Sequence, residues 1–326
     1  MAIKNRGLIS ITAALLMTSL TPPALSQQKE LAKVHVIWFS PDPVMTIAKA
    51  RGLFAAEGIE LQVTRTGSST QQMRGLSQGT YDIGSTAFDN VLAWSGKEGA
   101  EIVAVAQTAD RVILPLFVRP EIKAWNDFKG KKLAVDAVDT AFALVLRRIL
   151  LNNGLDLKRG DYELVPAGAP AQRVESMKRG DTYAGIINIP VDVQAKAAGL
   201  IPFEYQTEFL KDYPGTVLAV NRAWARGHRK ELVGFLRAWR SALTWSKDPA
   251  NRQAAVKLIV GETKMSPESA SRLLSLSPKD GLVNMSGAKT VLDIRNELAA
   301  PPLKGPALQV YVDLSYFKEA APAMNK

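Results

Sequence analysis

Apolar and polar positions alternate in blocks along the first part of the chain, and these blocks predict strands and helices in turn. The segments 34–39 and 101–106 are almost wholly apolar, as buried strands are, and 59–64 alternates like a half-buried strand. Between the first two strands, the apolar positions of 44–50 recur at helical spacing. This order favours a parallel sheet with helices on both faces.

A second alternating series follows Pro120, and a helical tail follows that series. We expect strands at 132–135, 162–165 and 183–187, with helices at 140–152, 170–177 and 190–198. A strand at 216–220 comes next, followed by helices at 249–260, 267–276, 286–299 and 307–318. The tail needs an apolar surface to cover, and the first series is the natural one.

The pattern therefore predicts an α/β fold of two Rossmann-like lobes joined by two crossing segments, with the C-terminal helices packed on lobe one. The first part of lobe one is expected at 27–116, lobe two at 117–215, and the rest of lobe one at 216–326. Clefts between such lobes are favoured sites for small molecules.

Small hydroxylated residues follow several of the predicted strands. In the stretch Tyr81–Asn90 we expect a short strand, a tight turn at Gly84-Ser85-Thr86, and the start of a helix. Similar turns are expected at 66–70, 40–43 and 138–140. Helix starts present unpaired N–H groups, and the ends of parallel strands gather at one edge of a sheet. The turns are therefore expected to form one binding surface.

The N-terminus has the pattern of a secretory signal peptide. Lys4 and Arg6 precede a mostly apolar stretch at 7–20, and Ala24-Leu25-Ser26 offers small residues for a signal peptidase. We expect cleavage of 1–26 before Gln27 and a periplasmic protein; an uncleaved membrane anchor is the alternative. Without cysteine, a lipoprotein anchor is excluded.

The composition of the chain restricts the kinds of site that it can form. The chain of 326 residues carries a net charge of +10, but its basic residues are scattered, which indicates a solvated surface and no nucleic-acid partner. With no cysteine and 2 histidines, we expect no disulfide, no metal site and no cofactor. No P-loop, dinucleotide fingerprint or nucleophile elbow is present.

Three segments resemble the periplasmic solute-binding proteins of ABC importers, in the sulfonate, taurine, nitrate and thiamine-precursor group. They are Ile47–Phe54, Tyr81–Thr86 and Asp127–Val135, in the order and spacing of that family. The resemblance implies the type II periplasmic binding fold, with a small ligand clamped between two lobes and delivered to a membrane permease. We also expect a monomer that catalyses no reaction.

The ligand-binding residues that this resemblance implies lie in the loops after the strands of both lobes. They are Ser40, Asp42, Ser68, Ser69, Thr70, Ser85, Thr86, Asp89, Asn90, Asp139, Thr140, Phe142 and Asn188.

The three aspartates in this set decide between ligand classes. Asp42, Asp89 and Asp139 can equally well cap their own helices. If two of them face the cleft, like charges disfavour a sulfonate or nitrate, and the ligand is expected to carry N–H donors, as an amine or pyrimidine does.

Two other functions use the same architecture. One is an enzyme of the pyrimidine-synthase type, which the absence of cysteine disfavours. The other is a sensor domain, which needs an attached helix-turn-helix or membrane helix that the sequence does not show. The sequence leaves open the identity of the ligand and of the permease.

Overall fold

The computed structural model describes residues 1–2, 30–299, 302–303 and 307–321. The signal peptide and cleavage site expected at 1–26 lie almost wholly outside these described residues. Every element named below belongs to the compact unit Leu31–Lys326. Across the described ranges, no helix has both the length and the apolar character needed to cross a bilayer.

The first sheet has five strands in the order β2-β1-β3-β10-β4. Their bounds are Ala32–Trp38 for β1, Ile59–Arg65 for β2, Ile83–Ala87 for β3, Ile102–Gln107 for β4 and Thr216–Asn221 for β10. Strand β1 pairs parallel to β2 and β3, whereas β10 runs antiparallel between β3 and β4. The four strands of the first series therefore run in one direction, as expected, and β10, which returns from the other sheet, lies between β3 and β4 in the opposite direction.

The second sheet also has five strands, in the order β7-β6-β8-β5-β9. They span Leu116–Val118 (β5), Lys131–Val135 (β6), Tyr162–Pro166 (β7), Ala184–Ile186 (β8) and Ile201–Phe203 (β9). Strand β6 is parallel to β7 and β8, and β5 is antiparallel to β8 and β9. The sequence pattern missed β9, which is three residues long and partly exposed.

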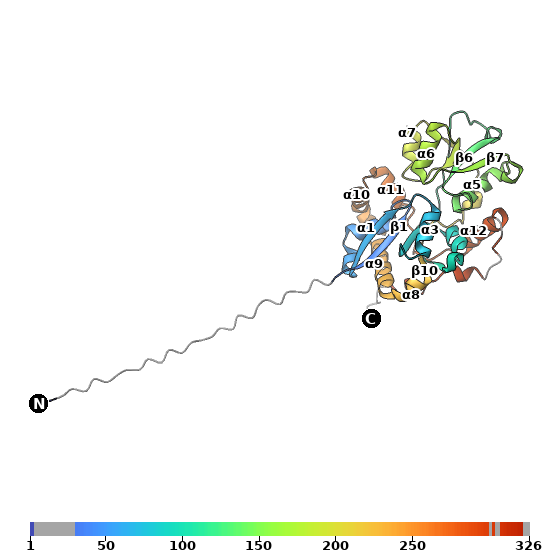
Figure 1. Cartoon of the computed structure of the whole chain (residues 1–326). Coiled ribbons are helices and arrows are strands. Elements are labelled where there is room, and N and C mark those ends of the chain that lie inside the picture. The colour runs from blue at the N-terminus through green and yellow to red at the C-terminus, as the bar shows by residue number, and fades with distance from the viewer. Residues whose placement is uncertain (3–29, 300–301, 304–306, 322–326) are drawn as a thin grey trace. The chain divides into compact units, whose positions relative to one another are not determined.

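The chain passes between the two sheets twice, from β4 to β5 and from β9 to β10 (Figure 1). Two sheets of this kind, flanked by helices, match the predicted α/β class. The lobe boundaries given above stay a prediction.

Helices flank both sheets. The first series contains α1 (Pro43–Ala50), α2 (Leu53–Ala56), α3 (Ser69–Ser77) and α4 (Phe88–Trp94), and the second contains α5 (Ala141–Asn152), α6 (Pro170–Arg179) and α7 (Asp192–Ala197). The tail contains α8 (Arg222–Gly227), α9 (Arg229–Lys247), α10 (Arg252–Thr263), α11 (Pro267–Leu274), α12 (Met285–Leu298) and α13 (Ser315–Glu319). Short 3-10 turns lie at Lys97–Gly99, Trp125–Phe128, Leu157–Arg159, Glu208–Leu210, Pro249–Asn251 and Leu308–Tyr311.

The tail helices cover the first sheet, and one of them also contacts the second series. Helix α9 packs on α1 and α2 through a fully buried stripe that includes Phe235 and Trp239. Helix α12 packs on α4 and also on α5. The single helix expected at 307–318 is wrong, because Val312 forms a β-bridge to Ala104 of β4 and keeps the backbone extended there.

The expected turn at Gly84-Ser85-Thr86 is also wrong. These residues lie inside β3, and α4 begins only at Phe88. Pairing with β10 along Ile83–Ala87 continues the strand. The close packing of Leu76 against Gly84 requires a glycine there, because an added Cβ would lie 2.7 Å from the Cδ1 of Leu76.

Candidate functional site

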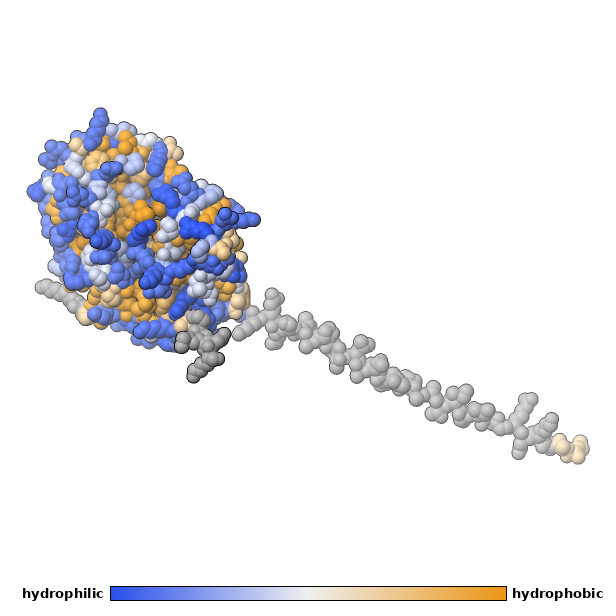
Figure 2. All heavy atoms as spheres, turned by 180° about the vertical axis from the view of Figure 1, so that it is seen from behind, coloured by the Kyte–Doolittle hydropathy of each residue, from blue (hydrophilic) through white to orange (hydrophobic). Residues whose placement is uncertain are grey.

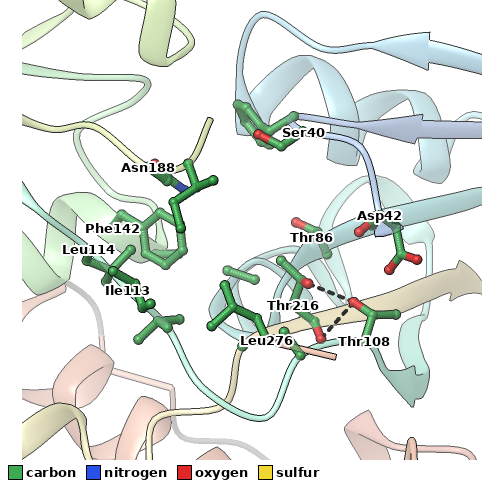
Figure 3. A pocket seen from close by; sticks show the side chains of 18 of the residues that line it. Ser40, Asp42, Thr86, Thr108, Ile113, Leu114, Phe142, Asn188, Thr216 and Leu276 are labelled. Atoms are coloured by element: carbon green, nitrogen blue, oxygen red, sulfur yellow. Dashed lines mark hydrogen bonds between the residues drawn. The ribbon is translucent and has the colours of Figure 1, made fainter. Parts of the chain in front are cut away.

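A pocket with a cavity volume of about 140 Å³ is lined by residues from the connections of both sheets. Ser40, Asp42 and Thr86 come from the first sheet, and Phe142 and Asn188 come from the second. Figure 3 shows these two groups facing each other across the pocket. The volume is comparable to that of a cavity that holds a benzene-sized molecule.

Most of the residues expected at the site line this pocket. They come from five separate segments, which are the loop after β1, the start of α3, β3 with α4, the start of α5 and the loop after β8. They are Ser40, Asp42, Ser69, Ser85, Thr86, Asn90, Phe142 and Asn188. The structure therefore brings hydroxylated residues of the first series to the same pocket as Phe142 and Asn188 of the second series. Their role in binding a ligand stays a prediction.

Two of the remaining five residues belong to the start of α3. Ser68 is the N-cap, and its Oγ accepts from the Gln71 N–H at 3.1 Å. Ser68 lines a second groove instead, together with Gln172 of α6. Thr70 is half-buried in the first turn of α3 and lines neither cavity.

The other three lie near the pocket but do not line it. Asp89 is 1% exposed, and its carboxylate accepts from Arg295 at 2.6 and 2.7 Å. Asp139 is exposed, and its carbonyl oxygen accepts from the same arginine at 2.8 Å. Thr140 is buried and donates to Asp136. Of the three aspartates, only Asp42 lines the pocket. Asp136, which was not among them, lines it as well, so the pocket contains two carboxylates.

Asp42 joins the pocket to the start of α1. Its Oδ1 accepts from the Met45 N–H at 2.6 Å, as an N-cap does, and from the Trp239 indole N–H at 3.3 Å. Burial raises the pKa of Asp42 to about 6, although these bonds to the carboxylate act in the opposite direction. This carboxyl group therefore changes charge close to neutral pH.

Asp136, which sequence reasoning missed, connects the two sheets at the pocket. It follows β6, and its Oδ2 accepts from the N–H and the hydroxyl of Ser69 at 2.9 and 2.5 Å. The Ser69 hydroxyl oxygen also accepts from the Asn90 amide at 3.3 Å, and that amide donates to Thr86 at 2.9 Å. A chain of polar contacts thus runs from the second sheet into α4.

Arg173 of α6 is a second residue that sequence reasoning missed. It lines the pocket, is 4% exposed, and its Nε has no hydrogen-bond partner among the described residues. Burial lowers its pKa, while Asp136 acts in the opposite direction. A signal existed, because Arg173 stands on the same helical stripe as Pro170, Val174 and Met177, where an apolar residue is expected.

Thr108 and Thr216 mark the place where the chain leaves and re-enters the first sheet. The Thr108 hydroxyl lies 2.7 Å from the Thr216 hydroxyl and 3.1 Å from its carbonyl oxygen (Figure 3). Both residues line the pocket, and the sequence pattern singled out neither.

The rest of the wall is largely apolar. Ile113 and Leu114 come from the passage between the sheets, Phe142 from α5, and Leu276 from the segment after α11. Neither histidine lines the pocket. Within the described ranges, no three His, Asp or Glu side chains gather in a way that could hold a metal ion.

Comparisons with known proteins give a family and a fold. A family model described as NMT1/THI5 like matches residues 44–251. No curated protein sequence matches the chain significantly.

Solved structures match most of the chain. A protein from Bordetella bronchiseptica RB50 has 20% identity and a TM-score of 0.74, covering 90% of this chain and 98% of that one. The alkanesulfonate-binding protein SsuA from Xanthomonas axonopodis pv. citri has 15% identity and a TM-score of 0.68, covering 89% and 98%. The periplasmic nitrate-binding protein NrtA from Synechocystis PCC 6803 has 14% identity and a TM-score of 0.73, covering 91% and 90%. The chain therefore has the fold of periplasmic binding proteins.

Proposed function

The chain belongs to the NMT1/THI5-like family, and we propose that it is the periplasmic substrate-binding component of an ABC importer. In this proposal it works as a monomer that captures a small polar organic metabolite and delivers it to a membrane permease. The observation that carries the proposal is the pocket, which both sheets line and into which both contribute buried polar side chains. The neighbours SsuA and NrtA are themselves binding proteins.

Capture follows from the way the chain joins its two sheets. The segments from β4 to β5 and from β9 to β10 are the only covalent links between the sheets in the described chain, so they can act as a hinge. A ligand that contacts both walls binds the closed arrangement better than an open one, and it therefore shifts the population toward closure. A permease can then distinguish the closed, loaded protein from the open one.

Export to the periplasm is part of the proposal. Lys4, Arg6 and the apolar stretch 7–20 support a signal peptide cleaved before Gln27. The NMT1/THI5-like family and the periplasmic neighbours agree with that location.

An enzyme of the pyrimidine-synthase type remains the less favoured alternative. Covalent catalysis needs a nucleophile with a base to activate it. The chain has no cysteine, and its pocket contains no histidine. The hydroxyl of Ser85 therefore has no imidazole base in the pocket.

The test is to identify what the protein carries. Protein purified under native conditions is denatured, and released small molecules are identified by mass spectrometry. The identified compound is then returned to ligand-free protein. We expect it to raise the melting temperature, because it binds only the native state, and to reduce the radius of gyration in solution scattering. Conversion of that compound by the protein would instead establish an enzyme.

A further inference from the structure

The contact between Ser69 and Asp136 lies on the side of the pocket away from the two passages between the sheets. In the first sheet, β10 and β4 carry the passages at one edge, and β2, which precedes α3, is the opposite edge. In the second sheet, β5 and β9 carry them, and β7 is the opposite edge, next to β6 and Asp136. Ser68 lines the second groove together with Gly168, which follows β7, so these two far edges face each other. A hinge motion about the passages therefore moves Ser69 far from Asp136.

The ion pair between α11 and α7 also joins the two series, but it lies closer to a passage. Arg272 of α11 pairs with Asp192 of α7 at 2.7 Å. Four residues after Arg272, the carbonyl oxygen of Leu276 accepts from the backbone N–H of Asp110, which belongs to the passage from β4 to β5. A rotation about the passages separates this pair less than it separates Ser69 from Asp136.

The contact of Ser69 with Asp136 is formed entirely by groups of the chain. The Oδ2 atom of Asp136 accepts from both the N–H and the hydroxyl of Ser69, at 2.9 and 2.5 Å. Its Oδ1 atom accepts from the Thr140 hydroxyl at 3.2 Å, which orients the carboxylate from its own side of the pocket. The Ser69 N–H belongs to the start of α3, where backbone donors have no partner within the helix. Hydrogen bonds to a carboxylate are stronger than those between neutral groups.

We infer that Ser69 and Asp136 form a latch that favours the closed arrangement of the free protein. Because the chain supplies both partners, the contact stabilises closure whether or not a ligand is bound, and a fraction of the free molecules is closed. The apparent affinity for a ligand is proportional to the fraction of molecules in the arrangement that binds it. The latch therefore increases affinity without contacting the ligand. This inference rests on the hinge motion of the proposed function and adds a control of that motion.

The test measures the distance between the two sides of the pocket in ligand-free protein. The chain has no cysteine, so Gln78→Cys just after α3 and Lys178→Cys on α6 provide one pair of exposed sites for spin labels. Denaturation, dialysis and refolding remove bound compounds, and pulsed electron paramagnetic resonance then gives the distribution of distances between the labels. We expect a population at the short distance of the structure described here.

Three variants of the labelled protein test the latch. Asp136→Ala should lower the ratio of the short to the long population by about tenfold, as the loss of hydrogen bonds to a charged group predicts. Ser69→Ala removes the hydroxyl but keeps the N–H, so it should lower the same ratio by a smaller factor. Asp139→Asn is the matched control, because Asp139 is an exposed aspartate of the same loop that contacts Arg295 through its backbone carbonyl oxygen. This control should leave the ratio unchanged.

The distances separate a failure of the latch from a failure of the hinge. Two populations whose ratio Asp136→Ala leaves unchanged would overturn the latch, and the hinge of the proposed function would stand. A long distance alone in the original protein would also overturn the latch. One narrow distance shared by every variant would overturn the hinge and the latch together. Circular dichroism and thermal melts check that the variants fold, and a lower melting temperature with an unchanged ratio would show that the contact only stabilises the fold.

Discussion

The carboxylate of Asp136, after β6 of the second sheet, accepts both the backbone N–H and the hydroxyl of Ser69, at the start of α3 beside the first sheet. The contact spans the pocket and joins residues 67 positions apart. It also places a negative charge at a helix N-terminus, where the helix dipole favours it.

We expect Ser69 and Asp136 to be coupled in stability. A double-mutant cycle with Ser69→Ala and Asp136→Ala, measured by urea unfolding, should give an interaction energy of about 1–3 kcal/mol, because the bonds are charge-assisted. Ser68→Ala is the control. It removes the N-cap of the same helix at a cost of about 1 kcal/mol, and it should show no coupling to Asp136. Additive effects at Ser69 and Asp136 would show that the contact contributes nothing.

Asp42 should make the stability of the free protein depend on pH. Its pKa is raised from 3.8 to about 6 in the folded protein, so the folded state binds the proton more tightly than the unfolded state. The contribution of Asp42 to the free energy of unfolding is therefore most favourable below pH 4. It becomes less favourable as the pH rises through 6.

Asp42→Asn should remove this dependence and keep the helix cap. We expect a gain of about 2 kcal/mol at pH 8 and a smaller gain at pH 5, measured by urea unfolding at each pH. Asp212→Asn, at an exposed position, is the control and should change neither value. An Asp42→Asn variant that is less stable at pH 8 would show that the ionised carboxylate stabilises the fold.

We expect substitutions at Asp89 to change the free energy of unfolding and not the binding of ligand. Its pairing with Arg295 is almost fully buried on both sides. Arg295→Met leaves an uncompensated buried carboxylate, at a cost of about 3–5 kcal/mol. The double variant Asp89→Leu/Arg295→Met should lose less than Arg295→Met alone. Thermal melts and urea unfolding measure both. If Asp89→Asn instead abolished a ligand-induced melting shift without changing the free protein, Asp89 would belong to the binding site.

Gly84 should tolerate no added methyl group. Gly84→Ala places a Cβ 2.7 Å from the Cδ1 of buried Leu76, and overpacking of this kind costs about 1–3 kcal/mol. Gly227→Ala is the control, because a Cβ at Gly227 meets nothing within 4 Å and alanine favours the helix. Equal stabilities of the two variants in urea unfolding would contradict this assignment of Gly84.

Hydrophilic side chains are distributed widely over the face seen in Figure 2. The charged pairs follow the same pattern, since most of them are exposed contacts such as Lys178–Glu175 and Lys289–Asp293. Exposed pairs of this kind contribute little to stability. The buried pair Asp89–Arg295 and the half-buried contact Asp136–Ser69 are therefore better targets for mutation.

The sequence by itself determined the order of the elements. Alternating apolar blocks predicted two α/β series and most element positions to within a few residues, because that information is local. It also indicated that hydroxylated segments after the strands would converge, since strand ends of one sheet meet at one edge.

Only the tertiary structure decided which side chains face the pocket. Asp89 pairs with Arg295, 206 residues further along the chain, and it does not line the pocket. Asp136 comes from the second sheet and accepts a hydrogen bond from Ser69. Arg173 is 4% exposed and lines the pocket, although its place beside Val174 on a helical stripe gives no sign of the pocket. The local pattern of the sequence does not predict such pairings, because they depend on how distant segments pack and on which charges that packing buries.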